Sequence, residues 1–197
     1  MQRRRLSPLA RVTLEVMWQL VPPEQHLPTV FASRHGEVIS THRMLTELVK
    51  KEPLSPAEFS HSVHNAIVGQ ASIFRHDRSE SVSVSAGDDT LAAGFLEAAG
   101  LLLDFDQVLV AAYDEPLPEP YRTEMPQENE RWAVVALLGR GAPNLVIERD
   151  DRSGPAAING GVATSRALKS LLASTENASM RQIGEHHDWV WSHHVVA

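Results

Sequence analysis

Cysteine is absent from this 197-residue chain. Without a thiol, the protein can form no disulfide, zinc ribbon or thiolate-ligated cluster, and it has no cysteine nucleophile. Long hydrophobic runs are also missing, because no apolar stretch approaches the roughly 20 residues that a membrane-spanning helix needs. Arg3, Arg4 and Arg5 precede an amphipathic segment rather than the apolar core of a signal peptide. We therefore expect a cytoplasmic protein without a membrane span.

Positive charge is scarce in the later part of the chain. Residues 79–197 carry eight Lys or Arg against eighteen Asp or Glu, and the whole chain has a formal net charge of −7. A surface of this sign repels a phosphate backbone, so nucleic acid is not expected as a partner. With 43% apolar and 22% charged residues and no internal repeat, the sequence predicts one globular domain over residues 1–197.

Cap and turn residues divide the chain into alternating helices and strands. Ser7 followed by Pro8 is typical of a helix start, and Ser40 and Ser55 are expected to cap two further helices. Strict alternation in residues 81–85 favours a half-buried strand, and the continuous apolar run 107–113 favours a strand covered on both faces. Helices are expected over 8–20, from Ser40 to Pro53, and over 55–74, 90–103 and 164–173, and strands over 29–33, 81–85, 107–113, 132–138 and 189–191. This order predicts an α/β fold.

The junction at Gly87 is the most informative place for chemistry. Here the strand 81–85 ends and a helix rich in alanine and glycine begins, so that the amides and dipole of the helix start would stabilise an anionic nucleophile or an oxyanion. The tip of this elbow carries Gly87, which has no reactive group, followed by Asp88 and Asp89. We interpret the two aspartates as acidic residues that complement the helix dipole, and their charge disfavours a carboxylated substrate.

A serine nucleophile offers an alternative chemistry. Ser83 or Ser85 would attack with His64 as the base, which makes a small stand-alone acyl thioester hydrolase the alternative function. Strand serines are common, however, and no spacing rule links either of them to His64.

Four histidines in residues 186–194 offer a metal-binding alternative, since imidazole suits zinc, copper or nickel. On a strand, His187 and His193 would share one face, whereas His186 and His194 would point the other way. Packed tryptophans with exposed histidines are therefore favoured over one closed metal site.

Several motifs between residues 3 and 140 resemble a known family. They are Phe31-Ala32-Ser33-Arg34-His35-Gly36-Glu37, Ser62-Val63-His64-Asn65-Ala66 with Gly69 and Ser72-Ile73, the elbow Ala86-Gly87, and Asp114-Glu115-Pro116-Leu117-Pro118. Together they resemble the short β-ketoacyl synthase-like family, which is related to the N-terminal half of the β-ketoacyl synthases. The resemblance implies a thiolase-like fold, half of the ketosynthase fold, with a mixed sheet and helices on both faces. Members of the family act as chain-length-factor-like subunits in aryl polyene or fatty-acid-like biosynthesis.

The resemblance also implies that the chain is not catalytic on its own. Condensing enzymes hold a nucleophilic cysteine at the start of this helix, where the present chain has Gly87, and their catalytic histidines come from a second half that has no counterpart here. No catalytic residue, metal or cofactor is therefore expected. Relatives carry a further first strand, so either the start of this chain is shortened or its sheet lacks an edge.

A half fold of this kind is expected to need a partner, because strand 82–86 and helix 90–103 would otherwise expose surface that is normally covered. We expect a heterodimer with a full-length ketosynthase, to which an acyl carrier protein delivers the substrate, or a homodimer through the same strand. Residues expected at the partner contact or the acyl tunnel are His64, Asn65, Gly69, Val82, Val84, Gly87, Asp88 and Asp89.

Overall fold

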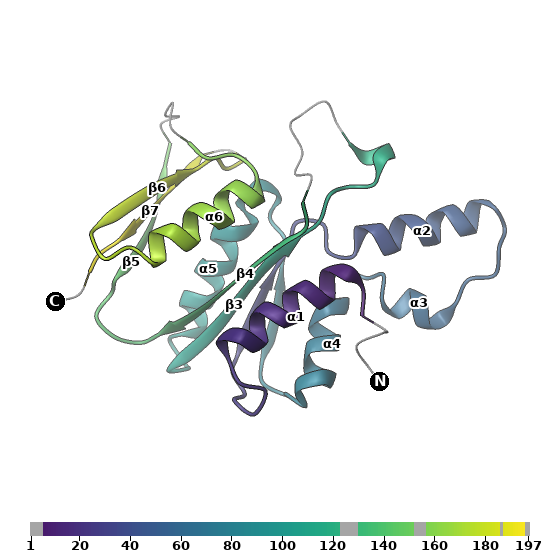
Figure 1. The fold of residues 1–197 in the computed structure, drawn as a ribbon, viewed down its shortest axis with the longest axis horizontal. Helices are drawn as coiled ribbons and strands as arrows, with labels where there is room; N and C mark the ends of the chain where they lie inside the picture. Colours follow the sequence, from purple (N-terminus) through teal and green to yellow (C-terminus); the bar gives the residue numbers. More distant parts are fainter. Residues whose placement is uncertain (1–5, 123–129, 152–156, 186, 196–197) are drawn as a thin grey trace.

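The computed structural model describes residues 6–122, 130–151, 157–185 and 187–195. Helical layers and sheets alternate in it (Figure 1). In chain order the elements, with short 3₁₀ turns marked η, are α1 (Pro8–Leu20), β1 (Thr29–Ala32), α2 (Val38–Val49), α3 (Pro56–Ser60), α4 (Ala66–Arg75), β2 (Ser81–Val84), η2 (Gly87–Asp89), α5 (Thr90–Leu101), β3 (Gln107–Asp114), η3 (Glu119–Tyr121), β4 (Trp132–Gly139), β5 (Leu145–Asp150), α6 (Gly161–Leu172), β6 (Ala178–Gln182) and β7 (Asp188–His193).

The first sheet contains four strands in the order β2-β1-β3-β4. β1 runs parallel to both β2 and β3, so Val30 lies between Val82 and Val110, and β4 adds antiparallel to β3. β2, α5 and β3 form a strand–helix–strand unit with β1 inserted between its two strands. The sheet is mixed and has helices on both faces, which confirms the predicted fold class (Figure 1).

Both faces of the central strand β3 are covered, as its continuous apolar run predicts. The even-numbered residues 108–112 join a hydrophobic cluster with α5, and the odd-numbered residues 109–113 join a second cluster with α1 and α4. Every residue from Val108 to Tyr113 is buried. The sheet is therefore the centre of two cores, one on each side.

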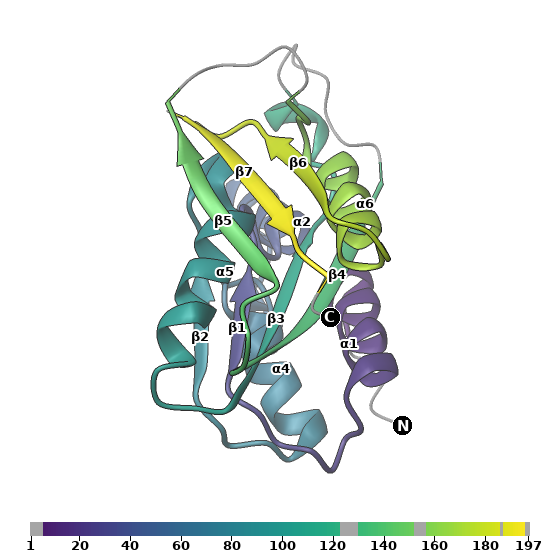
Figure 2. The ribbon, with the colours of Figure 1, turned by 90° about the vertical axis from the view of Figure 1, so that its left-hand side faces the viewer.

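Helix α5 lies between the first sheet and a second, antiparallel sheet of order β5-β7-β6 (Figure 2). On one side, Gly94 approaches β1 so closely that a Cβ there would stand 2.7 Å from the Cβ of Ala32. On the other side, Phe95 meets Trp191 edge to face with 5.0 Å between ring centroids. The small residues of α5 thus let the two sheets approach a shared helix.

Two local predictions are corrected by the structure, and two strands are added to the predicted ones. The helix expected over 55–74 is two helices, because the chain turns after Ser60 and α4 starts only at Ala66. α2 has Glu37 as its N-cap, whereas the Ser40 hydroxyl donates to the Glu37 carboxylate at 3.2 Å. β5 and β6 were not predicted, because both are short strands without a strong alternating pattern. No helix in the described ranges is long and apolar enough to span a membrane.

Candidate functional site

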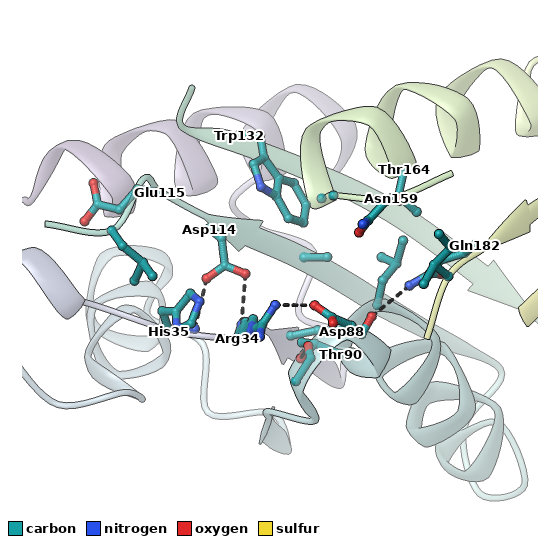
Figure 3. Close-up of a pocket in the computed structure, with 18 of the residues that line it drawn as sticks. Arg34, His35, Asp88, Thr90, Asp114, Glu115, Trp132, Asn159, Thr164 and Gln182 are labelled. Atoms are coloured by element: carbon teal, nitrogen blue, oxygen red, sulfur yellow. Dashed lines mark hydrogen bonds and ion pairs between the residues drawn. The ribbon is translucent and has the colours of Figure 1, made fainter. Parts of the chain in front are cut away.

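A cavity of about 270 Å³ lies at the carboxyl ends of β1 and β3, where α/β proteins commonly bind ligands (Figure 3). The elbow, the start of α6 and the end of β6 complete its walls. Its lining residues include Arg34, His35, Gly87, Asp88, Asp114, Glu115, Trp132, Asn159, Thr164 and Gln182. Segments that lie far apart in the sequence therefore meet in one pocket.

Asp114, at the end of β3, holds the turn that follows β1. Its carboxylate accepts hydrogen bonds from the Ser33 hydroxyl at 2.8 Å, the Arg34 amide at 2.9 Å and the His35 amide at 3.0 Å. The Ser33 hydroxyl accepts in turn from the Gly36 amide at 2.8 Å. Hydrogen bonds thus join the motifs 31–37 and 114–118 beside the cavity.

Burial shapes the ionisation of the groups around this turn. Desolvation raises the pKa of Asp114, although hydrogen bonds from Arg34 and Ser33 act against it. It also raises the pKa of Glu115, against the lowering effect of Arg131 at 2.9 Å. Burial lowers the pKa of His35. All three shifts favour the uncharged forms, as expected for a poorly hydrated wall.

The elbow has the geometry of a tight turn into α5. Gly87 has a φ of +57°, a left-handed backbone conformation that residues other than glycine rarely adopt. The Thr90 hydroxyl closes the turn, because it donates to the Gly87 carbonyl at 2.7 Å and accepts from the Ala86 amide at 2.9 Å. Gly87 and Asp88 line the cavity.

The two aspartates that follow Gly87 have separate partners. Asp88 forms an ion pair with Arg34. Its backbone carbonyl accepts a hydrogen bond from the side-chain amide of Gln182 at 3.0 Å. Asp89 accepts from the indole Nε1 of Trp189 at 2.7 Å and makes no side-chain cap for α5. Both aspartates precede the first turn of α5, in the 3₁₀ turn η2, and their side chains connect the elbow to the turn after β1 and to β7.

Glu185 blocks the outer side of the elbow. A Cβ built on Gly87 would collide with the Glu185 carboxylate. The Glu185 amide is held in place by Asp89, to which it donates at 3.2 Å. The place of a side chain at the elbow is therefore occupied by a carboxylate from the loop between β6 and β7.

Of the two serines considered as nucleophiles, Ser83 and Ser85, only Ser83 contacts His64. Its Nδ1 lies 3.2 Å from the Ser83 hydroxyl and its Nε2 lies 2.7 Å from the Ser33 carbonyl. Ser85 is not part of this arrangement, since its hydroxyl donates to the Arg34 carbonyl at 3.0 Å. Neither Ser83 nor His64 lines the cavity.

The remaining expected site residues lie on and beside β2. Val82 and Val84 are half-buried on this edge strand, and Val84 packs against the core around α5. Asn65 is the N-cap residue of α4 but makes no side-chain cap. Gly69 is exposed in α4, and a Cβ there would meet no atom within 4 Å. The structure therefore brings Gly87 and Asp88 together at the cavity and leaves the other expected residues outside it.

The histidine-rich C-terminus gives no metal centre in the described part of the chain. No group of three or more His, Cys, Asp or Glu side chains that could hold a metal ion occurs among those residues. His187 stacks edge to face on Trp189 with 4.7 Å between ring centroids. His186 lies outside the described residues.

The sequence did not single out Trp132, Asn159, Thr164 or Gln182 as site residues. Each belongs to a different segment, from the start of β4 to the end of β6, and none stands in a motif with a known spacing. Only the packing of α6 and β6 beside the elbow brings them together (Figure 3).

The family model described as the N-terminal domain of β-ketoacyl synthase matches residues 1–192. Among solved structures, the chain is similar to one described as the ketosynthase (ApeO) in complex with its chain length factor (ApeC) from Xenorhabdus doucetiae. The identity is 28%, the TM-score is 0.83, and the match covers 98% of this chain and 80% of that chain. The ishigamide ketosynthase/chain length factor is similar in fold alone, with 11% identity, a TM-score of 0.59, and coverage of 85% of this chain and 55% of that one. No match was found among curated protein sequences.

Proposed function

Since the chain belongs to the β-ketoacyl synthase family, by its match to the N-terminal domain, we propose that it is a non-catalytic, chain-length-factor-like subunit that pairs with an active full-length ketosynthase. It has the thiolase-like ketosynthase fold. In this proposal, residues 1–197 act as one domain. The observation that carries the proposal is the elbow, where Gly87 offers no nucleophile and Glu185 occupies the place of its side chain.

The chemistry of the elbow supports a non-catalytic role. A condensing enzyme needs a thiolate that is stabilised by the helix start, and this sequence contains no cysteine at all. The carboxylate of Glu185 at Gly87 would also repel the enolate or carboxylate of an extender unit. The proposal therefore assigns the covalent chemistry to the partner ketosynthase, to which an acyl carrier protein brings the acyl chain.

The free edge of β2 supports a protein partner. β2 pairs with β1 alone among the described strands, so one row of its backbone amides and carbonyls is available to another chain. Ser81, Ser83 and Ser85 are exposed and small, and no charged side chain or proline within the strand obstructs such pairing. A strand of the partner can therefore extend the sheet at this edge.

The helices before and after β2 extend this surface. On α4, Gly69 is open to solvent and Ile73 is 66% exposed. On α5, Leu96 is 46% exposed, and Leu103, just beyond the helix, is 79% exposed. A partner that docks on β2 and also reaches these helices would cover these apolar groups, which is the reason to expect a stable complex.

The choice of partner rests on a relative. The solved structure with 28% identity to this chain is a complex of a ketosynthase with its chain length factor. We infer that the present chain takes a comparable place beside a ketosynthase, with His64, Asn65, Gly69, Val82 and Val84 near the contact. The pathway proposed for this pair is aryl polyene or fatty-acid-like biosynthesis.

Co-expression with the ketosynthase encoded beside its gene tests the proposal. A heterodimer on size-exclusion chromatography with light scattering, together with condensing activity that needs both chains and the ketosynthase cysteine, would support it. A chain that remains monomeric, or that forms only a homodimer when the ketosynthase is present, would contradict it.

One contact favours a second candidate function. The 3.2 Å separation of His64 Nδ1 from the Ser83 hydroxyl suits a serine hydrolase acting on acyl thioesters. Hydrolysis of a short acyl thioester by the isolated chain, abolished in Ser83→Ala and retained in Ser85→Ala, would support this function over the first.

A further inference from the structure

The cavity between the sheets has a polar end that the proposed pairing does not use. We propose that it binds a small neutral molecule with a carbonyl group, which accepts hydrogen bonds from Thr164 and Asn159 while its apolar part lies against Trp132. This binding would be an additional property of the chain, separate from its contact with a ketosynthase.

Thr164 is the first reason for this assignment. It lines the cavity and is only 2% exposed, yet no hydrogen bond to its hydroxyl occurs among the described residues. Buried hydroxyls are nearly always satisfied by protein, water or ligand. A ligand oxygen in the cavity is a suitable partner for this hydroxyl.

The surroundings of Thr164 add further donors. Asn159 lies on the exposed rim of the cavity with its amide available, and the first turn of the twelve-residue helix α6 reaches the cavity at Gly161. α6 has glycine as its N-cap and therefore no side-chain cap. The indole Nε1 of Trp132 is a further buried donor without an acceptor. The Trp132 indole, the Thr164 hydroxyl and the Asn159 side-chain amide can all donate at this end, which suits a ligand with an acceptor group.

The charges around the cavity select a neutral acceptor over an anion. Asp88, Asp114 and Glu115 all line it. The cations near them are already engaged, because Arg34 pairs with Asp88 and Arg131 pairs with Glu115. A carboxylate ligand would bring a negative charge into a poorly hydrated site where these arginines are already paired, whereas a carbonyl ligand brings no charge.

Size and wall chemistry limit the ligand further. A cavity of about 270 Å³ has room for roughly nine water molecules at ~30 Å³ each. Its apolar lining residues are Leu91, Leu117, Ile183 and the ring of Trp132. A flat molecule of about this size with a single amide or ketone group matches both ends of the cavity. Benzamide is a suitable probe, and benzoate is its charged counterpart of nearly the same shape.

The proposed ligand contacts lie apart from the edge strand β2. Gly87 and Asp88 line the cavity, but Gly69, Val82 and Val84 do not, and Thr164 and Asn159 belong to a different part of the chain from β2. Loss of one function would therefore leave the other measurable.

Titration of the full ¹⁵N-labelled chain with benzamide tests the proposal, with the Trp132 indole signal identified by its loss in Trp132→Phe. We expect this signal to shift saturably and benzoate to bind at least tenfold more weakly. Thr164→Val should weaken benzamide binding at least fivefold. Thr13→Val is the matched control, because Thr13 is a buried helical threonine on the other side of the sheet whose hydroxyl bonds to the Leu9 carbonyl.

Asn159→Ala provides a second variant at the exposed rim, and we expect it to weaken benzamide binding at least threefold even if Thr164→Val fails to fold. Absence of a saturable shift at Trp132 would overturn the proposal. Equal binding of benzoate, or unchanged affinity in both Asn159→Ala and a folded Thr164→Val, would overturn it as well.

Discussion

The carboxylate of Glu185 lies against Gly87, on the side of the backbone from which a Cβ would project. The two residues come from opposite parts of the chain, and Asp89 keeps them together through the Glu185 amide. The elbow therefore lacks a nucleophile, and the exposed Glu185 side chain would have to move before a side chain at position 87 could occupy this place.

Replacing Gly87 with cysteine is expected to give neither a stable elbow nor a reactive thiol. The φ of +57° and the collision with Glu185 should together lower the free energy of unfolding by about 1–3 kcal/mol. Urea denaturation measures this loss, and intact mass after incubation with an acyl thioester measures acylation. Ser85→Cys, which places an exposed thiol two residues earlier, is the control.

In Gly87→Cys/Glu185→Ala the collision is removed but the backbone strain remains, so only part of the stability should return. If the cysteine at position 87 is acylated faster than the cysteine of the Ser85→Cys control in either variant, the proposal that the elbow is non-catalytic would be contradicted.

The two glycines of α5 should respond to alanine with opposite signs. At Gly100 an added Cβ meets nothing within 4 Å, so Gly100→Ala should stabilise the protein by about 0.8–1 kcal/mol through helix propensity. At Gly94 the added Cβ would stand 2.7 Å from Ala32, and overpacking of about 1–3 kcal/mol should exceed that gain. Thermal denaturation of both variants provides the comparison, and equal shifts would show that the layers are not in tight contact at Gly94.

The buried carboxyl of Glu37 should make stability depend on pH. Glu37 is 1% exposed and accepts from Ser7 and Ser40, and its burial raises its pKa. A raised pKa in the folded state means that stability is fully present below the unfolded value and is lost as pH rises through the folded value. Glu37→Gln removes this loss, so its stability relative to wild type should improve as pH increases from about 4.

Urea denaturation of Glu37→Gln and wild type between pH 4 and 7.5 measures this difference. Glu24→Gln, at an exposed position, serves as the control and should run parallel to wild type. A constant difference between Glu37→Gln and wild type over that range would refute the assignment.

A charge on the exposed face of α5 should prevent pairing with the ketosynthase. Leu96→Glu places a carboxylate on α5, the helix that follows β2, at a position that is 46% exposed. The isolated chain should therefore fold normally, while the complex weakens by at least tenfold. Leu20→Glu, at the end of α1 and 45% exposed, is the control of equal exposure. Binding is measured by pull-down and by light scattering, and loss of pairing in Leu20→Glu instead would place the contact elsewhere.

The sequence predicted those elements whose signals are local. Ser7 and Pro8 start α1, and the Ser7 side chain accepts from the Ala10 amide at 2.9 Å, because both capping partners lie within one turn. The strand–elbow–helix order around Gly87 was also predicted, since alternation, a tight turn and a run of small residues follow one another directly. The break between α3 and α4 was missed, because the apolar spacing continues through it.

Long-range contacts account for what the sequence did not reveal. Glu37 became the N-cap of α2 through the tertiary turn after β1, and no local pattern indicates this. The cavity depends on Trp132, Thr164 and Gln182, which meet only after α6 and β6 have packed beside the elbow. Asp114 stands in a sequence motif, but its three hydrogen bonds to the turn after β1 join residues about 80 positions apart, which no local pattern indicates.

The hydrogen bond from Trp189 to Asp89 spans 100 residues of sequence. During synthesis at about 5–20 residues per second, Trp189 is added roughly 5–20 s after Asp89. The elbow consequently remains without its final anchor while the sheet strands before it are already made. Until β7 has been made, Asp89 lacks its indole partner and Phe95 of α5 lacks its ring contact with Trp191.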